Sequence, residues 1–309
     1  MIIIDENSKI SLEKASYIAL GSFDGLHLGH LSLISKTIEL AKKNHCSSMV
    51  YTFRNHPLTV VNKERAPKLL LDNETKLEIL EELGIDVACL VNFNENFMKI
   101  EPEAFIEQLL TNYNAKGIIV GFNYRFGFKN KGDVELLKTL SEKYGFELHI
   151  MGALMNEENI ISSTKIRNLL AEGDLDSANA LLTRPYVLRG KVVLGKQLGR
   201  KLGFPTANIE VDSNAVLPKI GVYYTNTIYK SKLFKSITSV GYNPTVDGKN
   251  ITIETYILNF NKSIYGDELK VYFIERIRDE EKFDSLEALT QQLKSDKNFA
   301  ESRKKLKGL

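Results

Sequence analysis

The first half of the chain alternates short apolar runs with segments of helical period, and this alternation restricts the fold more than any other feature. Between residue 17 and about residue 150, apolar runs such as YIALGSF, SSMVYTF, DVACLVNF and GIIVGF are separated by amphipathic segments such as HLSLISKTIELAKK. Strands that are apolar on both faces belong to a parallel sheet covered by helices on both sides. The sequence therefore predicts an α/β domain, in which ligands bind beyond the carboxyl ends of the strands.

The second half has a different rhythm. From about residue 186, strand-like stretches such as YVLRGKVVLG and ELKVYFIERIR alternate with polar turns such as VDGKN, which predicts an antiparallel barrel or sandwich. The tail SLEALTQQLKSDKNFAESRKKLK has a helical period with Leu286, Leu289 and Leu293 on one side, and predicts a helix laid against this domain. We expect two domains, residues 1–183 and 184–309.

Composition excludes several classes of partner. The 41 basic and 39 acidic residues leave a net charge of +2, which provides little field for binding a nucleic-acid backbone. No apolar run approaches the roughly 18 residues of a membrane span, and the opening MIIIDENSKI lacks the pattern of a secretory signal. We therefore expect a cytoplasmic protein with small-molecule partners, without nucleic acid or membrane; the oligomeric state is not predictable.

The two cysteines fit the same compartment. Cys46 and Cys89 each lie within an apolar, strand-like context, and we interpret both as core residues in a reducing cytoplasm. The alternative, a redox or metal pair, is disfavoured because neither has a second ligand at a suitable spacing.

The decapeptide GSFDGLHLGH at 21–30 is the first candidate site. It follows a predicted strand and leads into a predicted helix, where backbone amides and the helix dipole favour an anion. His27 and His30 are placed to donate hydrogen bonds to nucleotide phosphates and to charge developing at phosphorus. Positioning then suffices for nucleotidyl transfer without a protein nucleophile. A tight turn with incidental histidines remains an alternative, and a zinc pair is less favoured because no third ligand accompanies them.

A second anion site is predicted at residues 162–167, SSTKIR. Its hydroxyls can cap the helix that follows, and Arg167, one turn in, can bind phosphate oxygens with both arms of its guanidinium. An ordinary capped helix is the alternative interpretation.

The barrel half carries a third candidate, GKQLGRKLGFPTANI, from Gly195 to Ile209. Glycines four residues apart, at 195, 199 and 203, with Lys196, Arg200 and Lys201 between them, suit a loop over anionic phosphates. Thr206 and Asn208 follow on one side of an extended segment and offer neutral oxygens to a magnesium ion with ATP. A basic surface loop is the alternative.

Glu254 is the remaining candidate. In ITIETYILNF it shares one strand face with Thr252 and Tyr256. A glutamate there can take the proton from a primary alcohol that attacks the terminal phosphate of ATP. An exposed strand glutamate without a catalytic role is the alternative.

The motifs of the first half resemble a known family. GSFDGLHLGH, TFRNHP (52–57), VGFNYRFGFKNKGD (120–133) and ISSTKIR (161–167), in this order, are similar to the adenylyltransferase module of the bacterial bifunctional riboflavin kinase/FMN adenylyltransferases, also called FAD synthetases. The resemblance implies a Rossmann-like nucleotidylyltransferase domain in which His27 and His30 act on the ATP phosphates. It further implies an ATP site with Gly21, Phe23, Asp24, Ser163, Thr164 and Arg167, and a flavin or adenine contact at Asn123, Tyr124 and Arg125. Asn123 departs from the family's usual Asp.

The rest of the chain resembles the riboflavin kinase module of the same family. GRKLGFPTAN, GVYY (221–224), GYNPTVDG (241–248), IETYILNF, IYGDELKV (264–271) and RDEEKF (278–283) carry this resemblance. It implies a β-barrel kinase in which Thr206 and Asn208 bind Mg²⁺ and ATP, and Glu254 is the base on the ribityl 5′-hydroxyl. It also implies ATP contacts at Gly195, Gly199, Lys201 and Gly203, and a flavin contact at Arg278.

Together the two resemblances imply that the chain converts riboflavin and ATP into FMN and ADP, and then FMN and ATP into FAD and pyrophosphate, both with Mg²⁺. Two alternatives stay open at this point. One is a riboflavin kinase whose first domain is inactive or repurposed, because of Asn123. The other is a non-enzymatic flavin sensor or RNA-binding regulator, against which the balanced charge argues.

Overall fold

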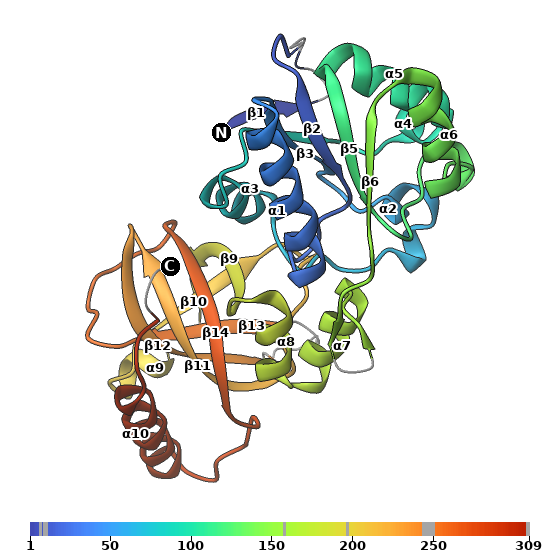
Figure 1. Cartoon of the computed structure of the whole chain (residues 1–309). Helices are drawn as coiled ribbons and strands as arrows, with labels where there is room; N and C mark the ends of the chain where they lie inside the picture. Colours follow the sequence, from blue (N-terminus) through green and yellow to red (C-terminus); the bar gives the residue numbers. More distant parts are fainter. Residues whose placement is uncertain (6–7, 9–11, 157–158, 196–197, 243–250, 307–309) are drawn as a thin grey trace. The chain divides into compact units, whose positions relative to one another are not determined.

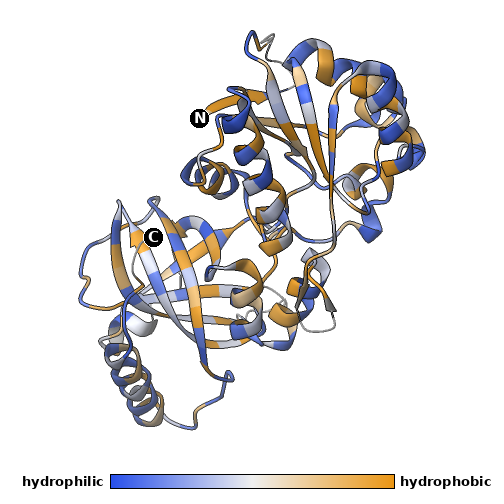
Figure 2. Cartoon of the chain, in the orientation of Figure 1, coloured by the Kyte–Doolittle hydropathy of each residue, from blue (hydrophilic) through white to orange (hydrophobic). Residues whose placement is uncertain are grey.

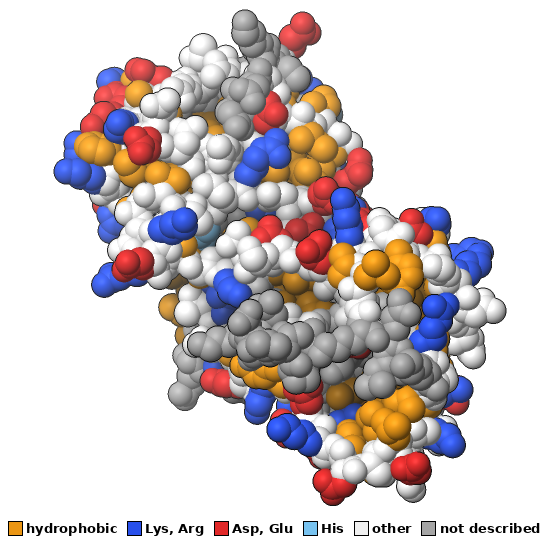
Figure 3. Space-filling model, turned by 180° about the vertical axis from the view of Figure 1, so that it is seen from behind, with side chains coloured by type: hydrophobic (Ala, Val, Ile, Leu, Met, Phe, Trp, Pro, Cys, Tyr) orange, Lys and Arg blue, Asp and Glu red, His pale blue; other side chains and the backbone are white. Residues whose placement is uncertain are grey.

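The structure is a computed structural model, and it describes residues 1–5, 8, 12–156, 159–195, 198–242 and 251–306 (Figure 1). The chain divides into two compact units. Met1–Leu69 and Asn73–Ser163 form the first, and Leu70–Asp72 and Thr164–Leu309 form the second. On the face shown in Figure 3, basic and acidic side chains are interspersed, as the balanced composition predicts.

The first unit is built on a six-stranded sheet in which every neighbouring pair is parallel. The strand order is β1-β4-β3-β2-β5-β6. The strands are β1 (Ile2–Asp5), β2 (Ser16–Leu20), β3 (Ser47–Phe53), β4 (Val87–Val91), β5 (Ala115–Gly121) and β6 (Glu147–Met151). All residues of β2 and β4 are buried, which explains their continuous apolar runs. The predicted parallel sheet is confirmed.

Helices cover both faces of this sheet. The longer ones are α1 (Leu28–Lys43), α3 (Asn73–Glu82), α5 (Pro102–Tyr113) and α6 (Val134–Tyr144), and α2 (Leu58–Val61) and α4 (Glu95–Met98) are single turns. Buried residues of α5 and α6, such as Phe105 and Leu137, share one apolar cluster with alternate residues of the strands. The helix α1 contacts β2, β3 and β5 and covers the other face (Figure 1). Figure 2 shows hydrophobic and hydrophilic residues on each of these helices, as amphipathic packing requires.

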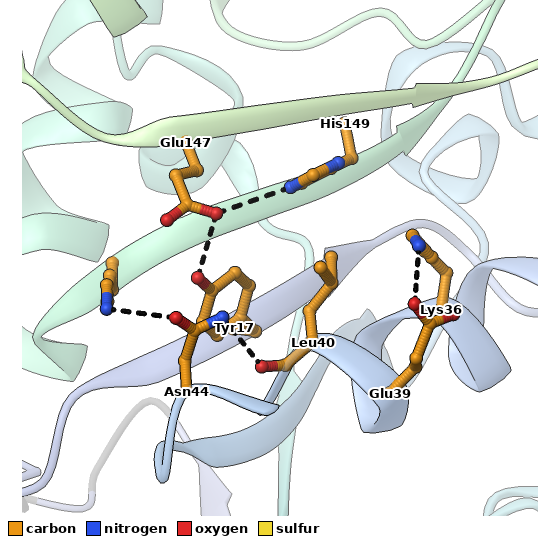
Figure 4. A network of polar contacts seen from close by, with 8 residues as sticks. Tyr17, Lys36, Glu39, Leu40, Asn44, Glu147 and His149 are labelled. Carbon is orange, nitrogen blue, oxygen red and sulfur yellow. Dashed lines mark hydrogen bonds and ion pairs between the residues drawn. The ribbon is translucent and has the colours of Figure 1, made fainter. Parts of the chain in front are cut away.

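A polar network joins β2 to β6 (Figure 4). The hydroxyl of Tyr17 donates to Glu147 at 2.8 Å, and Nε2 of His149 lies 3.5 Å from the same carboxylate. Burial, together with the neighbouring carboxylate, raises the pKa of Tyr17. The Tyr17 ring lies over Gly117 of β5, where a Cβ would come within 2.4 Å of the ring. A glycine is therefore required on β5 at this point.

The second unit is a closed barrel in which all strand pairs are antiparallel. Its order is β10-β13-β12-β11-β14-β9. The strands are β9 (Tyr186–Val193), β10 (Thr206–Val211), β11 (Gly221–Tyr229), β12 (Lys232–Tyr242), β13 (Ile251–Ile257) and β14 (Glu268–Arg278). The sequence predicted a barrel or a sandwich, and the closed barrel resolves that choice.

Two helices precede the barrel in sequence, α7 (Ser163–Glu172) and α8 (Leu175–Leu182). The helix α8 contacts β9 and β14. The side chain of Asn179 in α8 donates to the carbonyl of Phe273 at 3.0 Å and accepts the backbone N–H of Tyr186 at 2.7 Å. Almost all of α7 and all of α8 therefore belong to the same compact unit as the barrel. The boundary that the sequence predicts, at 183/184, divides the chain by function and assigns both helices to the first domain.

The C-terminal helix α10 (Leu286–Ser302) packs against the barrel, as predicted. Its contact face differs from the leucine stripe seen in the sequence. Leu286 is 57% exposed, whereas Asp296 and Ala300 are buried. The guanidinium of Arg278 at the end of β14 binds Asp296, with Nη2 at 2.8 Å and Nε at 3.1 and 3.2 Å. A buried ion pair therefore attaches the helix to the barrel.

Candidate functional site

The loop after β2 has an unusual backbone. Phe23, Gly25 and Leu26 have positive φ angles of 48°, 85° and 44°. Phe23 and Leu26 are fully buried, and such conformations in non-glycine residues persist only where surrounding contacts hold them. The order of the sheet also reverses here, since β3 lies on one side of β2 and β5 on the other. Both observations are typical of a ligand site at the carboxyl end of a parallel sheet.

The two histidines of GSFDGLHLGH lie side by side at the start of α1. His27 is the residue that precedes the helix, and its ring stacks on that of His30 with centroids 3.7 Å apart and planes at 20°. The ring of Phe23 meets His30 edge-on at 5.3 Å. A Cβ at Gly29 would lie 3.1 Å from the His27 ring, so the glycine leaves room for the imidazole. Two imidazoles at a helix N-terminus form a favourable environment for phosphate.

The structure brings Ser163 to this loop. Its hydroxyl donates to the carbonyl of Asp24 at 2.9 Å, and Asp24 is itself buried. A Cβ at Gly21 would lie 3.2 Å from the ring of Phe23, so residue 21 packs closely on the same loop. Thr164 and Arg167 lie in the second compact unit, and their place beside the histidines stays a prediction.

The segment after β5 contains the residues that the sequence predicts to contact the flavin or adenine. Tyr124 stacks on Phe126 with centroids 5.7 Å apart, and burial raises the pKa of Tyr124. Asn123 and Arg125 are exposed, and Nη1 of Arg125 lies 3.1 Å from a carboxylate oxygen of Asp133. The segment therefore presents an aromatic ring, an amide and a paired guanidinium beyond the carboxyl end of the sheet.

Sequence reasoning missed one residue of this region, Lys76 of α3. It is 3% exposed, and its Nζ lies 3.2 Å from the carbonyl oxygen of Phe53 and 3.4 Å from that of Ser22. A lysine in TKLEILEELG reads as part of a solvated helix face, because long charged side chains are rarely buried. Only the hydrogen bonds from its Nζ to the carbonyls of Ser22 and Phe53 reveal it.

In the second unit, Thr206, Asn208 and Glu254 meet across β10 and β13. The hydroxyl of Thr206 donates to Oε2 of Glu254 at 3.1 Å. Asn208 pairs directly with Glu254 in the antiparallel register. Neutral hydroxyl and amide oxygens beside a carboxylate are a donor set that suits Mg²⁺, and the three predicted residues are together.

At each of the three glycines of the loop, a larger residue would clash with a neighbouring atom or strain the backbone. A Cβ at Gly195 would lie 2.1 Å from Nδ2 of Asn208, and one at Gly199 would lie 2.3 Å from the carbonyl oxygen of Phe204. Gly203 has a φ of +84°, a conformation that favours glycine. The backbone N–H of Phe204 donates to the carbonyl of Gly199 at 2.8 Å. Tight backbone packing therefore brings the glycine-rich segment against Asn208.

Some predicted residues of this loop lie outside the described part of the chain. Lys196 is one of them, and for Lys201 only the backbone, at the end of the short helix α9 (Leu198–Lys201), is described. Their contacts with ATP stay predictions. Arg278 is described, and its guanidinium is bound to Asp296, so its expected flavin contact also stays a prediction.

A cavity of about 290 Å³ adjoins Thr206. It is also lined by Thr255 of β13 and by the segment from Phe260 to Tyr265. The hydroxyl of Thr255 shares a 2.9 Å hydrogen bond with that of Thr238 inside the barrel. The motifs IETYILNF and IYGDELKV include the two ends of the 260–265 segment, but sequence reasoning did not predict that the segment lines a cavity. The cavity therefore lies next to Thr206, one of the two predicted Mg²⁺ ligands.

Comparison with known proteins covers both halves of the chain. The model of the FAD synthetase family matches residues 9–165, and that of the riboflavin kinase family matches residues 182–303. The chain belongs to the family of bifunctional riboflavin kinase/FMN adenylyltransferases. The enzyme of that name from Bacillus subtilis is 34% identical over 290 residues, covering 92% of this chain and 91% of its own. The one from Listeria monocytogenes is 36% identical over 281 residues, covering 90% and 89%.

A solved structure shares the whole fold of this family member. It is described as a macrolide-efflux protein from Streptococcus pneumoniae, is 32% identical, and superposes with a TM-score of 0.89 over 98% of this chain and 100% of its own. This description differs from the names of the curated relatives, which agree with one another and with the two family models. Of the helices that the structure describes in this chain, none combines the length and apolar character needed to cross a membrane.

Proposed function

We propose that this family member makes FAD in two steps, phosphorylating riboflavin to FMN in the barrel and adenylylating FMN in the sheet domain. One observation carries the proposal. Each half of the chain has its own cluster of predicted phosphate-site residues, with two stacked histidines in one and the Thr206–Glu254 pair in the other. The two family models fall on these halves separately. By function we divide the chain into residues 1–183 and 184–309.

In the first half, positioning and charge stabilisation carry the adenylyl transfer. A phosphate oxygen of FMN attacks the α-phosphorus of ATP, the bond to the β-phosphate breaks, and pyrophosphate leaves. His27 and His30 donate hydrogen bonds to the phosphates and to the negative charge that develops at phosphorus. We assign triphosphate contacts to Gly21, Phe23, Asp24, Ser163, Thr164 and Arg167, and flavin or adenine contacts to Asn123, Tyr124 and Arg125.

In the second half, Glu254 is the general base. Thr206 donates its hydroxyl proton to one oxygen of the carboxylate, which orients Glu254 and leaves the other oxygen to accept the proton of the ribityl 5′-hydroxyl. Thr206 and Asn208 would hold Mg²⁺, which when bound neutralises charge on the ATP phosphates. The loop with Gly195, Gly199, Lys201 and Gly203 covers those phosphates, and Arg278 lies on the flavin side.

Two features of the first half support an active enzyme in the cytoplasm. The loop that holds His27 and His30 is hydrogen-bonded by Ser163 and Thr52, and the FAD synthetase family model covers this half of the chain. Both observations favour an active first domain over the alternative of an inactive one. Cys46 and Cys89 are both free and buried, as in a reducing compartment. We propose that the partners of the protein are its small-molecule substrates.

Chromatography of the products tests the proposal. The purified protein is incubated with ATP and Mg²⁺, together with riboflavin in one sample and FMN in a second. We expect FMN followed by FAD in the first sample and FAD in the second. FMN without FAD in both samples, also under reducing conditions, would restrict the chain to riboflavin kinase.

Two variants assign the steps to their sites. His30→Ala should abolish FAD formation from FMN and leave riboflavin phosphorylation unchanged, because the two clusters lie in separate units. Glu254→Gln should suppress riboflavin phosphorylation, while FMN added directly is still converted into FAD. Loss of both activities in either folded variant would contradict the two-site assignment.

A further inference from the structure

The carbonyl of Ser22, in the loop that carries the histidines, receives two hydrogen bonds from neighbouring elements. Nζ of Lys76 donates to it from α3 at 3.4 Å, and the hydroxyl of Thr52 donates from β3 at 2.8 Å. The same ammonium also donates to the carbonyl of Phe53 at 3.2 Å. Lys76 is 3% exposed and Thr52 is fully buried. A buried cation and a buried hydroxyl therefore fix the orientation of one peptide group of the loop.

This peptide group has a second polar end, the N–H of Phe23. In a trans peptide the C=O and the N–H point in opposite directions, and the described backbone contains no cis bond. The Phe23 N–H therefore points away from Lys76 and Thr52. Within the described part of the chain it makes no hydrogen bond, although Phe23 is fully buried. A buried N–H without a partner is costly in a protein, and a bound anion supplies the partner.

We propose that Lys76 is a positioning residue for adenylyl transfer, holding the Ser22–Phe23 peptide so that the Phe23 N–H donates to a phosphate oxygen of ATP. The inference rests on the proposed function of the first half. If the peptide rotates, its carbonyl oxygen takes the place of the N–H and repels the phosphate. The bond to the ammonium opposes this rotation because hydrogen bonds from charged donors are the stronger class. Lys76 thus acts through the backbone, without touching the nucleotide.

Four variants separate this role from simple support of the fold. Lys76→Met removes the ammonium, Lys76→Arg retains a charged donor, and Thr52→Val removes the other donor to the same carbonyl with little change of shape. Lys138→Met is the matched control, since Lys138 is a half-exposed lysine of α6 in the same unit. Steady-state rates of FAD formation, rates of riboflavin phosphorylation and thermal unfolding are measured for each variant, and pyrophosphate binding is measured by calorimetry.

We expect Lys76→Met to raise the KM for ATP in FAD formation and to weaken pyrophosphate binding, each about tenfold. Thr52→Val should act in the same direction by about threefold, and Lys76→Arg should recover part of the loss. Riboflavin phosphorylation should stay within about twofold in all four proteins, since the barrel contributes equally to each. Lys138→Met should match the wild type in every measurement.

Two results would overturn the inference. One is pyrophosphate binding that is unchanged in both Lys76→Met and Thr52→Val. The other is a loss of FAD formation that equals the loss of folded protein, with KM unchanged. Calorimetry also distinguishes this inference from the proposed function. If the wild type forms no FAD but its pyrophosphate binding depends on Lys76, the adenylyl transfer is refuted and the anion-binding role of the lysine stands.

Discussion

The substitution Gly195→Ala should strongly impair riboflavin phosphorylation without unfolding the barrel. An ideal Cβ at residue 195 lies 2.1 Å from Nδ2, 2.4 Å from Cγ and 2.7 Å from Oδ1 of Asn208. Ordinary contact begins near 3.4 Å, so the amide of Asn208 must move by about 1 Å, and a displacement of that size can cost about 100-fold in rate. The clash is with the end of a side chain, so the backbone is not forced to shift.

The assay compares both activities of Gly195→Ala with its unfolding temperature. We expect kcat/KM for riboflavin phosphorylation to fall about 100-fold, while the free energy of unfolding changes by less than about 1 kcal/mol. FAD formation from FMN should be unchanged. Gly266→Ala is the control, because Gly266 has a φ of +81° and nothing lies within 4 Å of its Cβ position. That variant should lose stability from backbone strain and retain phosphorylation.

Normal phosphorylation by folded Gly195→Ala would refute the reasoning, since Asn208 would then not need its present position. Equal loss of both activities would also refute it, because the effect would no longer be local to the kinase site.

Three further predictions concern stability. Gly117→Ala should destabilise the first unit by about 1–3 kcal/mol in denaturant unfolding, because the buried Tyr17 ring blocks the new methyl group. Asp133 accepts a backbone N–H at the start of α6, which lowers its pKa. The stabilisation by the ionised carboxylate is therefore present above the unfolded-state pKa and is lost as pH falls through the folded-state pKa. Asp133→Ala should destabilise the first unit more at pH 7 than in acid unfolding below both pKa values. Asp296→Ala leaves the Arg278 guanidinium without its buried partner. We expect the barrel to lose roughly 3 kcal/mol of stability in thermal unfolding. An unchanged melting temperature would contradict the structural role of the ion pair.

The local order of the chain was readable from the sequence. Buried parallel strands are continuous apolar runs and the helices between them are amphipathic, so periodicity predicted the sheet, the barrel half and α10. The candidate residues were chosen from local spacing and from the resemblance to the family. The structure stacks His27 on His30 and bonds Thr206 to Glu254, whereas the roles of these residues stay predictions.

The tertiary structure alone decided which distant groups meet. Sequence reasoning gave Lys76 no role, but in the structure its ammonium is buried and donates to the loop that bears the histidines. The sequence shows a leucine stripe on α10, but Leu286 is exposed. The helix contacts the barrel through Phe299 and Ala300 and through the ion pair between Asp296 and Arg278. These contacts join side chains from elements that are far apart in sequence. The cost of removing a charge from water is offset by its partner only when the elements are packed together. No local sequence pattern therefore encodes these contacts.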